Sequence, residues 1–445
     1  MYAVPHRKAP HTQRGQALAV LLVLLAALLS ALWWTVDVGA AVSEKQRLAN
    51  AADAAALSGA VWQARALNFD AYTSRAMIAN EVAIAQSVSL RSWSAYMARL
   101  LPAAALVTSW VPYLNSAMMT LQRVWTVLDA GLQPSLAIFE SYSTALTYTL
   151  AGAQRMMHTG TALVVPAVVR ETITEIDPRY ELSKAGELAI SSWVADWSTF
   201  SSFYGGAFRW RQRDLVYRSM DGFSSDRRFT LNALPGTQIA RLEKRGGTEL
   251  LDFETWRGLD ALSVHQPRYL FFGSVRERTP VAWASAEAGR PQLLRGQHGG
   301  AYTTNPRASR LAERVIRRMP SYLGLPSMWD LSTRQRETFD PPRVIVRLRL
   351  PQDLRRGTAD AFGITEITDL SGRAVQLGQE TRDWYAESVA TTPFERRDER
   401  ADGARELPSL FSPYWRARLT SLRTQEQLAL ALADGTPSGL AAVPR

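Results

Sequence analysis

Two groups of residues in the C-terminal half have types and spacings that could support catalysis. Asp252 and Glu254 stand two positions apart, so on a strand they would share one face as a general acid and a general base. His298-Gly299-Gly300 has the composition of a loop that donates backbone hydrogen bonds to an oxyanion. No nearby residues complete either site, and the patterns G-x-S-x-G, H-E-x-x-H and G-x-x-x-x-G-K-S/T are absent from the sequence. We therefore expect no enzyme activity, a simple glycine turn after His298, and carboxylates such as Asp340 that pair with arginines.

The composition also gives little support for metal, redox or nucleic-acid chemistry. The sequence has no Cys, and its five His residues are scattered at positions 6, 11, 158, 265 and 298, so we expect no metal site and no cofactor. The formal net charge is +10, but nearly all the basic residues are arginines interleaved with acidic residues. A nucleic-acid surface would gather its cations on one face. The expected partners therefore include neither nucleic acid nor a small-molecule substrate.

The element that must position everything else is an apolar run near the start of the chain. From Ala17 to Val36 there are 20 residues without a charge, which as a helix is the length that spans the hydrocarbon core of a bilayer. Leu and Ala form such a helix readily, and all its backbone groups are then bonded within the segment. Trp33 and Trp34 stand at its distal end, where indole rings favour the membrane interface. The run predicts a transmembrane helix.

The charges on either side of this run predict its orientation. Basic residues precede it at positions 7, 8 and 14, and the first charges after it are acidic, Asp37 and Glu44. Because basic flanks stay in the cytoplasm, we expect residues 1–16 on the cytoplasmic side of a bacterial inner membrane and the bulk of the chain in the periplasm. A cleaved signal peptide is the alternative, with a candidate cleavage site at Gly39-Ala40-Ala41, although its apolar core would normally be shorter. Either alternative exports the rest of the chain.

Beyond the membrane segment we expect an α+β protein in which helices come first and antiparallel strands come later. Pro102, Pro112, Pro134, Pro166 and Pro178 are expected to end or divide the helices. In the later part, alternating or apolar runs predict strands, and SRLAERVIRRM predicts one amphipathic helix. The expected segments are a cytoplasmic basic N-terminus (1–16), a transmembrane helix (17–36), a long Ala-rich helix (37–101), a helical region (102–198), a mixed strand/helix periplasmic domain (199–432, with strands at 269–275 and 343–350 and a helix at 309–319) and a flexible tail (433–445).

The Ala-rich helix carries the candidate interface. Its small residues recur at spacings of three and four, and small residues let another helix approach closely. Two polar residues close to this stripe could pair with a partner helix and set its register; the alternative is a solvated helix face. The candidate helix-packing or partner-interface residues are Asn50, Ala52, Asp53, Ala55 and Gly59. Near the other end, Tyr414-Trp415 is interpreted as core aromatic packing.

Several of these segments together resemble the Tad-like (TadE/G-like) family of Flp pilus-assembly proteins. The resemblance lies in Arg14-Gly15-Gln16-Ala17, the apolar run, Val36-Asp37-Val38-Gly39 and the block from Gln46 to Ala60, QRLANAADAAALSGA. It covers about residues 14 to 60. It implies a membrane-anchored, pilin-like component of Tad (Flp, type IVb-like) pilus biogenesis whose partners are the lipid bilayer and other Tad pilus-assembly proteins or pilins. A membrane-tethered envelope enzyme or sensor with an unrecognised site is the alternative.

The sequence departs from the wider pilin pattern in two places. Type IV prepilins carry an acidic residue five positions after the glycine at the cleavage site, and counting from Gly15 that position is Val20. This difference argues against processing by a prepilin peptidase and against incorporation into the filament shaft. Some family members also carry a metal site of pattern D-x-S-x-S, which Asp330-Leu331-Ser332 and Asp369-Leu370-Ser371 begin but do not complete. We therefore expect no such metal site.

Overall fold

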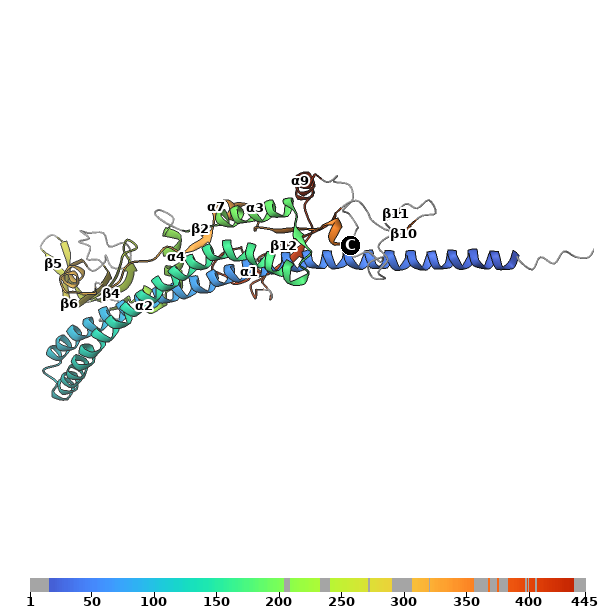
Figure 1. The fold of residues 1–445 in the computed structure, drawn as a ribbon. Coiled ribbons are helices and arrows are strands. Elements are labelled where there is room, and N and C mark those ends of the chain that lie inside the picture. Colours follow the sequence, from blue (N-terminus) through green and yellow to red (C-terminus); the bar gives the residue numbers. More distant parts are fainter. Residues whose placement is uncertain are drawn as a thin grey trace, which may run out of the picture.

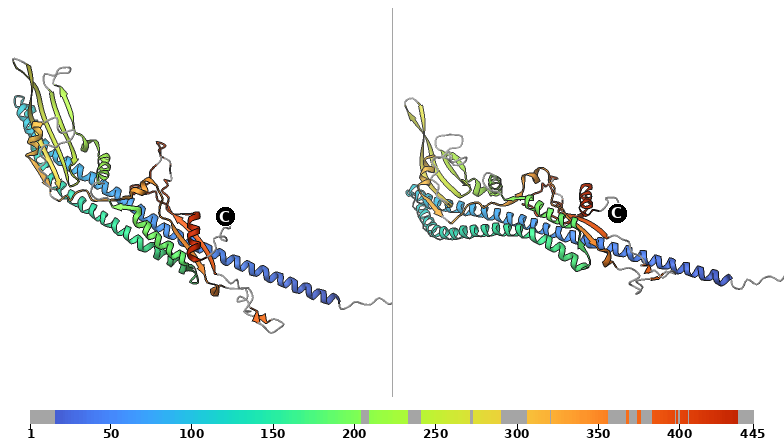
Figure 2. Two further views of the ribbon diagram at one scale, coloured as in Figure 1. Left: turned by 90° about the horizontal axis from the view of Figure 1, so that it is seen from above. Right: turned by 45° about the horizontal axis from the view of Figure 1, so that its top comes forward.

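The computed structural model is an elongated molecule built along a pair of very long helices (Figure 1 and Figure 2). Helix α1 (Gln16–Val107) has 92 residues, and its first part extends alone from one end of the molecule. Helix α2 (Pro112–Ile176) returns antiparallel along α1. We call α1 from Glu44 onward, together with α2, the hairpin. The structure describes residues 16–203, 209–232, 241–270, 273–289, 306–319, 321–355, 367–368, 374–375, 383–396, 398, 400–404 and 406–435.

Three of the five prolines do not end or divide the helices as the sequence predicts, whereas Pro112 begins α2 and Pro178 follows its end. Pro102 lies inside α1, so the prediction that this helix ends at residue 101 is wrong; it continues to Val107. Pro134 and Pro166 lie inside α2. Each interior proline removes one backbone hydrogen bond and costs about 3 kcal/mol. Packing along the whole length of two paired helices outweighs that cost, because tertiary contacts supply most of the stability of a helix.

The seam between the two helices is unusually polar. From Thr144 to Val165 the buried residues of α2 recur at alternating spacings of three and four, the pattern of a coiled coil. Within this seam Gln154 Nε2 donates to the backbone oxygen of Asp70 at 2.9 Å. Arg91 of α1 and Glu140 form a buried ion pair at 3.1 Å. Such buried polar contacts favour one register of the two helices over its neighbours.

A layer of helix and sheet covers the half of the hairpin nearer to the N-terminal end. Its four-stranded antiparallel sheet has the order β1-β9-β12-β13, and a buried core of alanines from α1, valines from α2 and β9, and aromatic side chains from α3 lies between these layers. Trp415 is buried in this core against Phe200 and Phe394, which confirms that it is a packing residue. The elements are β1 (Glu181–Leu182), α3 (Lys184–Phe200), β9 (Val344–Leu350), β12 (Trp384–Thr391), β13 (Arg418–Thr420) and α9 (Thr424–Asp434).

A second sheet packs on the far half of the hairpin. Its five strands have the order β3-β4-β5-β6-β7, antiparallel except for the parallel pair β6 and β7. Its strands and the helix beside it are β3 (Phe229–Asn232), β4 (Arg241–Leu250), β5 (Thr255–Leu270), β6 (Gly273–Gly289), β7 (Ile316–Met319) and α6 (Pro306–Glu313). The shorter elements are β2 (Ser201–Phe203), β8 (Trp329–Leu331), α4 (Arg209–Ser219), α5 (Gly222–Ser225), α7 (Thr333–Glu337), η2 (Gln352–Leu354), β10 (Ile367–Thr368) and β11 (Ala374–Val375).

The α+β class is confirmed, but two element predictions in the C-terminal part are wrong. Residues 269–275 are not one strand, because they include the end of β5 and the start of β6, and residues 271–272 lie outside the described part. Residues 309–319 are not one helix, because α6 ends at Glu313 and Ile316 begins β7. The backbone there pairs with β6, and Arg317 reaches Asp129 of α2 at 2.8 Å. The predicted strand at 343–350 is confirmed as β9.

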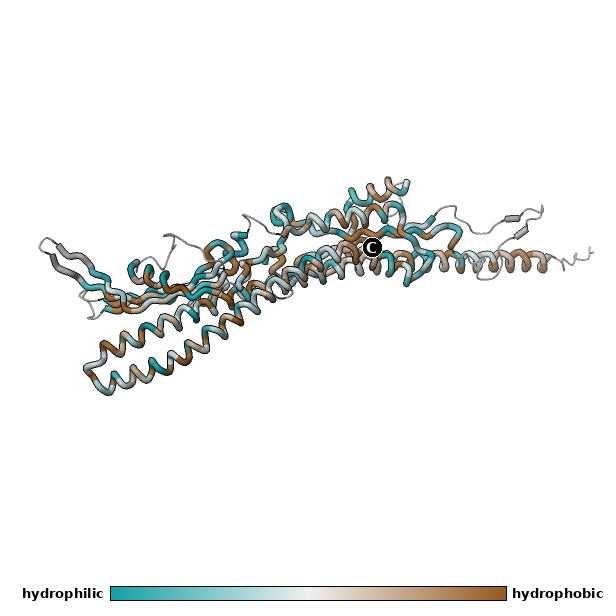
Figure 3. Tube along the Cα trace, turned by 60° about the vertical axis from the view of Figure 1, so that its left-hand side comes forward, coloured by the Kyte–Doolittle hydropathy of each residue, from teal (hydrophilic) through white to brown (hydrophobic). Residues whose placement is uncertain are grey.

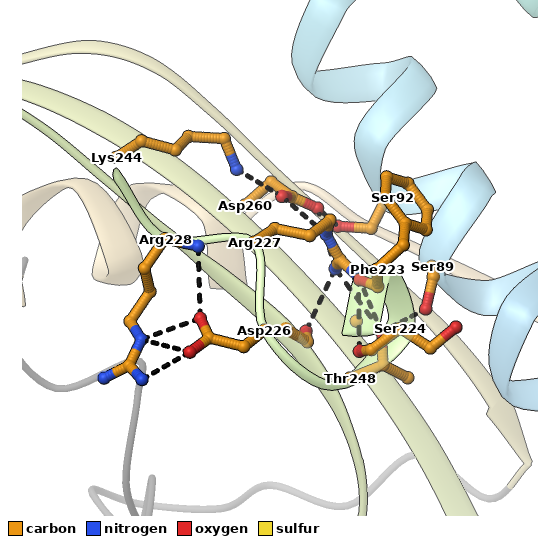
Figure 4. A network of polar contacts seen from close by, with 12 residues as sticks. Ser89, Ser92, Phe223, Ser224, Asp226, Arg227, Arg228, Lys244, Thr248 and Asp260 are labelled. Atoms are coloured by element: carbon orange, nitrogen blue, oxygen red, sulfur yellow. Dashed lines mark hydrogen bonds and ion pairs between the residues drawn. The ribbon is translucent and has the colours of Figure 1, made fainter. Parts of the chain in front are cut away.

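A buried ionic cluster fastens the second sheet to α1 (Figure 4). Asp260 of β5 accepts hydrogen bonds from Arg227 at 3.0 Å and from Ser92 of α1 at 2.7 Å, and it also pairs with Lys244. Burial alone would raise the pKa of the Asp260 carboxyl, but the two cations outweigh this effect and the pKa is lowered. Gly246 lies opposite, where a Cβ atom would be pressed against an oxygen of Asp260. The cluster needs both its charges and this glycine.

Candidate membrane anchor

Most of the first part of α1 is exposed in the described structure. Its leucines are exposed, with 63% of Leu21 and 68% of Leu28 accessible. Figure 3 shows that much of this segment is hydrophobic. Among the described residues, α1 is the one helix that is long and apolar enough to cross a membrane, and its most apolar part is not buried at all. The chain therefore begins with a candidate single-pass membrane anchor.

The local chemistry of this segment suits lipid better than water. Burying one leucine side chain contributes about 1.5–3 kcal/mol, and the segment carries eight leucines between Leu18 and Leu32. Its hydroxyl groups need no outside partner, because Ser30 donates to the Ala26 oxygen at 2.8 Å and Thr35 donates to the Leu32 oxygen at 2.7 Å. In hydrocarbon every polar group must be satisfied internally. The described segment meets that condition for both hydroxyls.

An ionic clamp marks the point where the anchor enters the body of the protein. Glu44 is a buried residue of α1, and Arg179 from the loop after α2 pairs with it at 2.6 Å. Arg179 also pairs with Asp177 at 2.8 Å. Arg179 donates hydrogen bonds to Asp177 and to Glu44, and these bonds raise the pKa of Arg179 against the opposing effect of burial. One turn further on, Leu48 is the first fully buried leucine of α1. The clamp therefore fixes where the exposed helix ends and the hairpin begins.

Most of the predicted interface residues pack within the chain. Ala52 and Ala55 are fully buried in the core of the first layer. Gly59 is buried too, and a Cβ atom there would lie 2.9 Å from a methyl of Val344. These three residues do promote close helix packing, but their assignment to a partner interface is corrected, because α2 and β9 cover them. Asn50 is exposed and Asp53 is half-buried.

The polar residue that organises this core was not among the predicted site residues. Gln63 is fully buried, and its Nε2 donates to Thr392 Oγ1 at 2.6 Å and to the Pro342 oxygen at 3.1 Å. Its Oε1 accepts from Trp193 Nε1 at 2.8 Å. One side chain thus joins α1 to α3 and to the segments beside β9 and β12. The available signal was its position four residues after Gly59, on the same face of the helix.

The other residues considered for catalysis make structural contacts where the structure describes them. Asp252 accepts a hydrogen bond from the backbone of Glu254 at 3.2 Å in the turn before β5. Asp340 pairs with Arg423 at 2.6 Å, as expected for a salt-bridge partner, in the wall of a cleft between α3, α7 and α9. His298-Gly299-Gly300 and Asp369-Leu370-Ser371 lie outside the described residues. No group of three metal-ligating side chains occurs in the described part of the chain.

His158 is held as a neutral aromatic residue. Its ring stacks between Trp197 and Trp329, with ring centroids 4.7 and 4.3 Å away. Burial lowers the pKa of His158 to about 4. The ring is therefore uncharged near neutral pH and serves as part of the core.

Comparison with known proteins finds one similarity, and it falls on the anchor and the start of the hairpin. Residues 15–64 match the model of the family described as "Putative Flp pilus-assembly TadE/G-like". No curated protein and no solved structure matches the chain. The matched segment includes the exposed apolar helix, Glu44 of the ionic clamp and the small buried residues of the first core.

Proposed function

From a chain whose residues 15–64 match the TadE/G-like Flp pilus-assembly family, we infer a membrane-anchored, pilin-like structural or assembly component of Tad (Flp, type IVb-like) pilus biogenesis. The observation that carries this inference is the exposed, uncharged first part of α1, which belongs to the matched segment. A helix that presents only lipid-like side chains can bind a bilayer and other transmembrane helices. The role is one of anchoring and packing, without catalysis.

The charges around the anchor support one orientation. Basic residues stand at positions 7, 8 and 14, and acidic residues follow the apolar run at Asp37 and Glu44. The N-terminus then lies in the cytoplasm of a bacterium, and the hairpin with both sheets lies in the periplasm. Val20 replaces the acidic residue of prepilins, so the anchor stays attached and the protein assists the filament without forming its shaft.

The partners are other Tad pilus-assembly proteins or pilins, and they pack on the anchor. The small residues that continue the helix past the membrane, such as Ala52 and Ala55, are buried against other elements of this chain. The anchor itself exposes Ala, Ser and Leu side chains on every side of the helix. Small residues allow close approach between helices in lipid. Partner helices therefore bind between residues 17 and 36.

Deletion of the gene in its host and complementation with variants test this role. Flp pili are counted by electron microscopy, and the wild-type chain is expected to restore them. Leu21→Asp combined with Leu28→Asp should not, because two charges in lipid cost about 2.5–3.5 kcal/mol each. Leu163→Asp, at an equally exposed site on α2, is the matched control and should restore pili. A deletion strain with a normal number of pili would overturn the proposal.

A further inference from the structure

The turn of the hairpin carries a second exposed apolar surface, at the opposite end of the molecule from the anchor (Figure 1). We call residues 100–122 the tip. Of its side chains, 77% of Leu106, 81% of Trp110 and 91% of Tyr113 are accessible. Leu100 is the last residue of α1 in the hydrophobic cluster that this helix shares with the second sheet, and the two helices continue beyond it to the turn (Figure 1). Exposed apolar surface of this kind marks a binding site for an apolar partner.

Both helices carry a cation just behind the tip. Residues 100–122 contain no Asp, Glu, Lys or Arg, and Arg99 and Arg123 bound this span on the two helices. Arg99 lies 8 residues before the end of α1 and Arg123 lies 11 residues after the start of α2, which corresponds to about 12 and 16 Å along the helices. Arg123 is exposed, and the guanidinium of Arg99 lies over the ring of Trp283. Two cations thus stand behind an uncharged end.

Several polar groups of the tip are satisfied from within. At the turn, the backbone N–H of Thr108 donates to the Ala104 oxygen at 3.0 Å, and that of Val111 donates to the Thr108 oxygen at 3.0 Å. The hydroxyl of Thr108 also donates to Ala104, at 2.9 Å. On α2, Ser116 and Thr120 donate to backbone oxygens of their own helix, each at 2.9 Å. These groups can leave water without losing their hydrogen bonds.

We propose that the tip inserts into one leaflet of a lipid bilayer. The distances of about 12 and 16 Å between the helix ends at the turn and these arginines are close to half of a hydrocarbon core of about 30 Å. Insertion to that depth places Trp110 and Tyr113 in lipid and brings Arg99 and Arg123 to the phosphate groups. A convex end with aromatic side chains at its extremity and cations behind it suits a lipid surface better than a protein groove.

The bilayer that the tip enters is not the one that holds the anchor. Helix α1 is continuous from Gln16 to Val107, and Val36 and Arg99 are separated by about 95 Å of helix. Figure 2 shows the helix curving without turning back. The chain therefore bridges two facing lipid surfaces. This inference goes beyond pilus assembly and does not depend on it, because its test uses purified protein and lipid alone.

The absence of Cys from the sequence permits a direct test. Val107→Cys is labelled with an environment-sensitive fluorophore in the full-length chain, whose anchor is held in a nanodisc. Vesicles of phosphatidylcholine and phosphatidylglycerol are then added. We expect a blue shift, increased emission, and quenching by a lipid-bound quencher placed in the acyl chains. Met156→Cys, equally exposed on α2 but far from the tip, is the matched control and should not respond.

Co-flotation of the same nanodisc-held protein with these vesicles gives the second measurement. Trp110→Asp with Tyr113→Asp should lower the bound fraction about tenfold or more, whereas Met156→Asp should not change it. If the double variant does not fold, the fluorescence of the labelled Val107→Cys chain still shows whether the tip enters lipid. An unchanged fluorophore, an equal response at Met156→Cys, or a response to protein concentration without vesicles would overturn the proposal, and the last would identify a second copy as the partner.

Discussion

Replacing Gly59 with alanine measures how tightly the hairpin packs on its first layer. A Cβ atom at this position would lie 2.9 Å from Val344 Cγ1, 3.1 Å from Val169 Cγ2 and 3.3 Å from Val165 Cγ1. Valine side chains are stiff at χ1, so these methyl groups cannot swing aside without moving the backbone. Overpacking of this kind costs about 1–3 kcal/mol.

The same substitution at Gly152 isolates that cost. Gly152 lies on the exposed face of α2, and a Cβ atom there meets nothing within 4 Å. Gly152→Ala should therefore stabilise the protein by about 1 kcal/mol, the difference in helix propensity. Gly59→Ala gains the same stabilisation from helix propensity, but it also adds the overpacking cost of about 1–3 kcal/mol. We therefore expect a net destabilisation of about 1 kcal/mol. The two sites should differ by about 1–3 kcal/mol.

Urea unfolding of the full chain in detergent micelles measures both changes. Tryptophan fluorescence follows the transition, because Trp193 and Trp197 are fully buried in the core that contains Gly59's neighbours. The change in midpoint multiplied by the slope of the transition gives each free-energy difference. If Gly59→Ala stabilises the protein as much as Gly152→Ala does, the three helix and sheet elements do not meet at this glycine.

Three further predictions concern buried charges. Burial raises the pKa of Glu81 to about 7, so the folded state holds a proton more tightly than the unfolded state. As the pH rises from 4.5 to 7, the free energy of unfolding of the wild type should therefore fall by about 3 kcal/mol relative to that of Glu81→Gln. Urea midpoints measure this change. Burial lowers the pKa of His158 to about 4, so wild type should lose stability relative to His158→Phe as the pH falls from 6.5 to 4. Asp260→Ala leaves two buried cations without this carboxylate and should lower the free energy of unfolding by about 3–5 kcal/mol. Asp214→Ala, which removes an exposed pair, should lower it by less than about 0.5 kcal/mol. Equal losses would contradict the role of the cluster.

Part of this architecture can be predicted from the sequence because local residue patterns determine it. The anchor is predicted from an unbroken apolar run, and the helix after it from small residues at helical spacing. The strand at 344–350 alternates basic and apolar residues between prolines and is found as predicted. In these segments local propensity and periodicity agree with the final packing.

The remaining features depend on contacts that sequence patterns do not reveal. The seam of α2 carries Thr147, Gln154 and His158 where an apolar stripe would be expected. The partners of Gln154 and His158 lie far away along the chain. Pro134 and Pro166 are local breaking signals that packing overrides. The buried Asp260 of β5 finds its cation on another strand, Lys244 of β4. Tertiary pairing decides these positions, and no local rule predicts it.

The central claim is that the exposed first part of α1 crosses a membrane with the hairpin outside. Because the sequence has no Cys, Arg7→Cys and Met156→Cys each provide one label site in the full chain expressed in its host. In spheroplasts an impermeant maleimide should label Met156→Cys and leave Arg7→Cys unlabelled until the membrane is lysed, and both products should remain with the membrane after an alkaline wash. Labelling of neither residue before lysis, with the full-length product in the soluble fraction, would contradict the account.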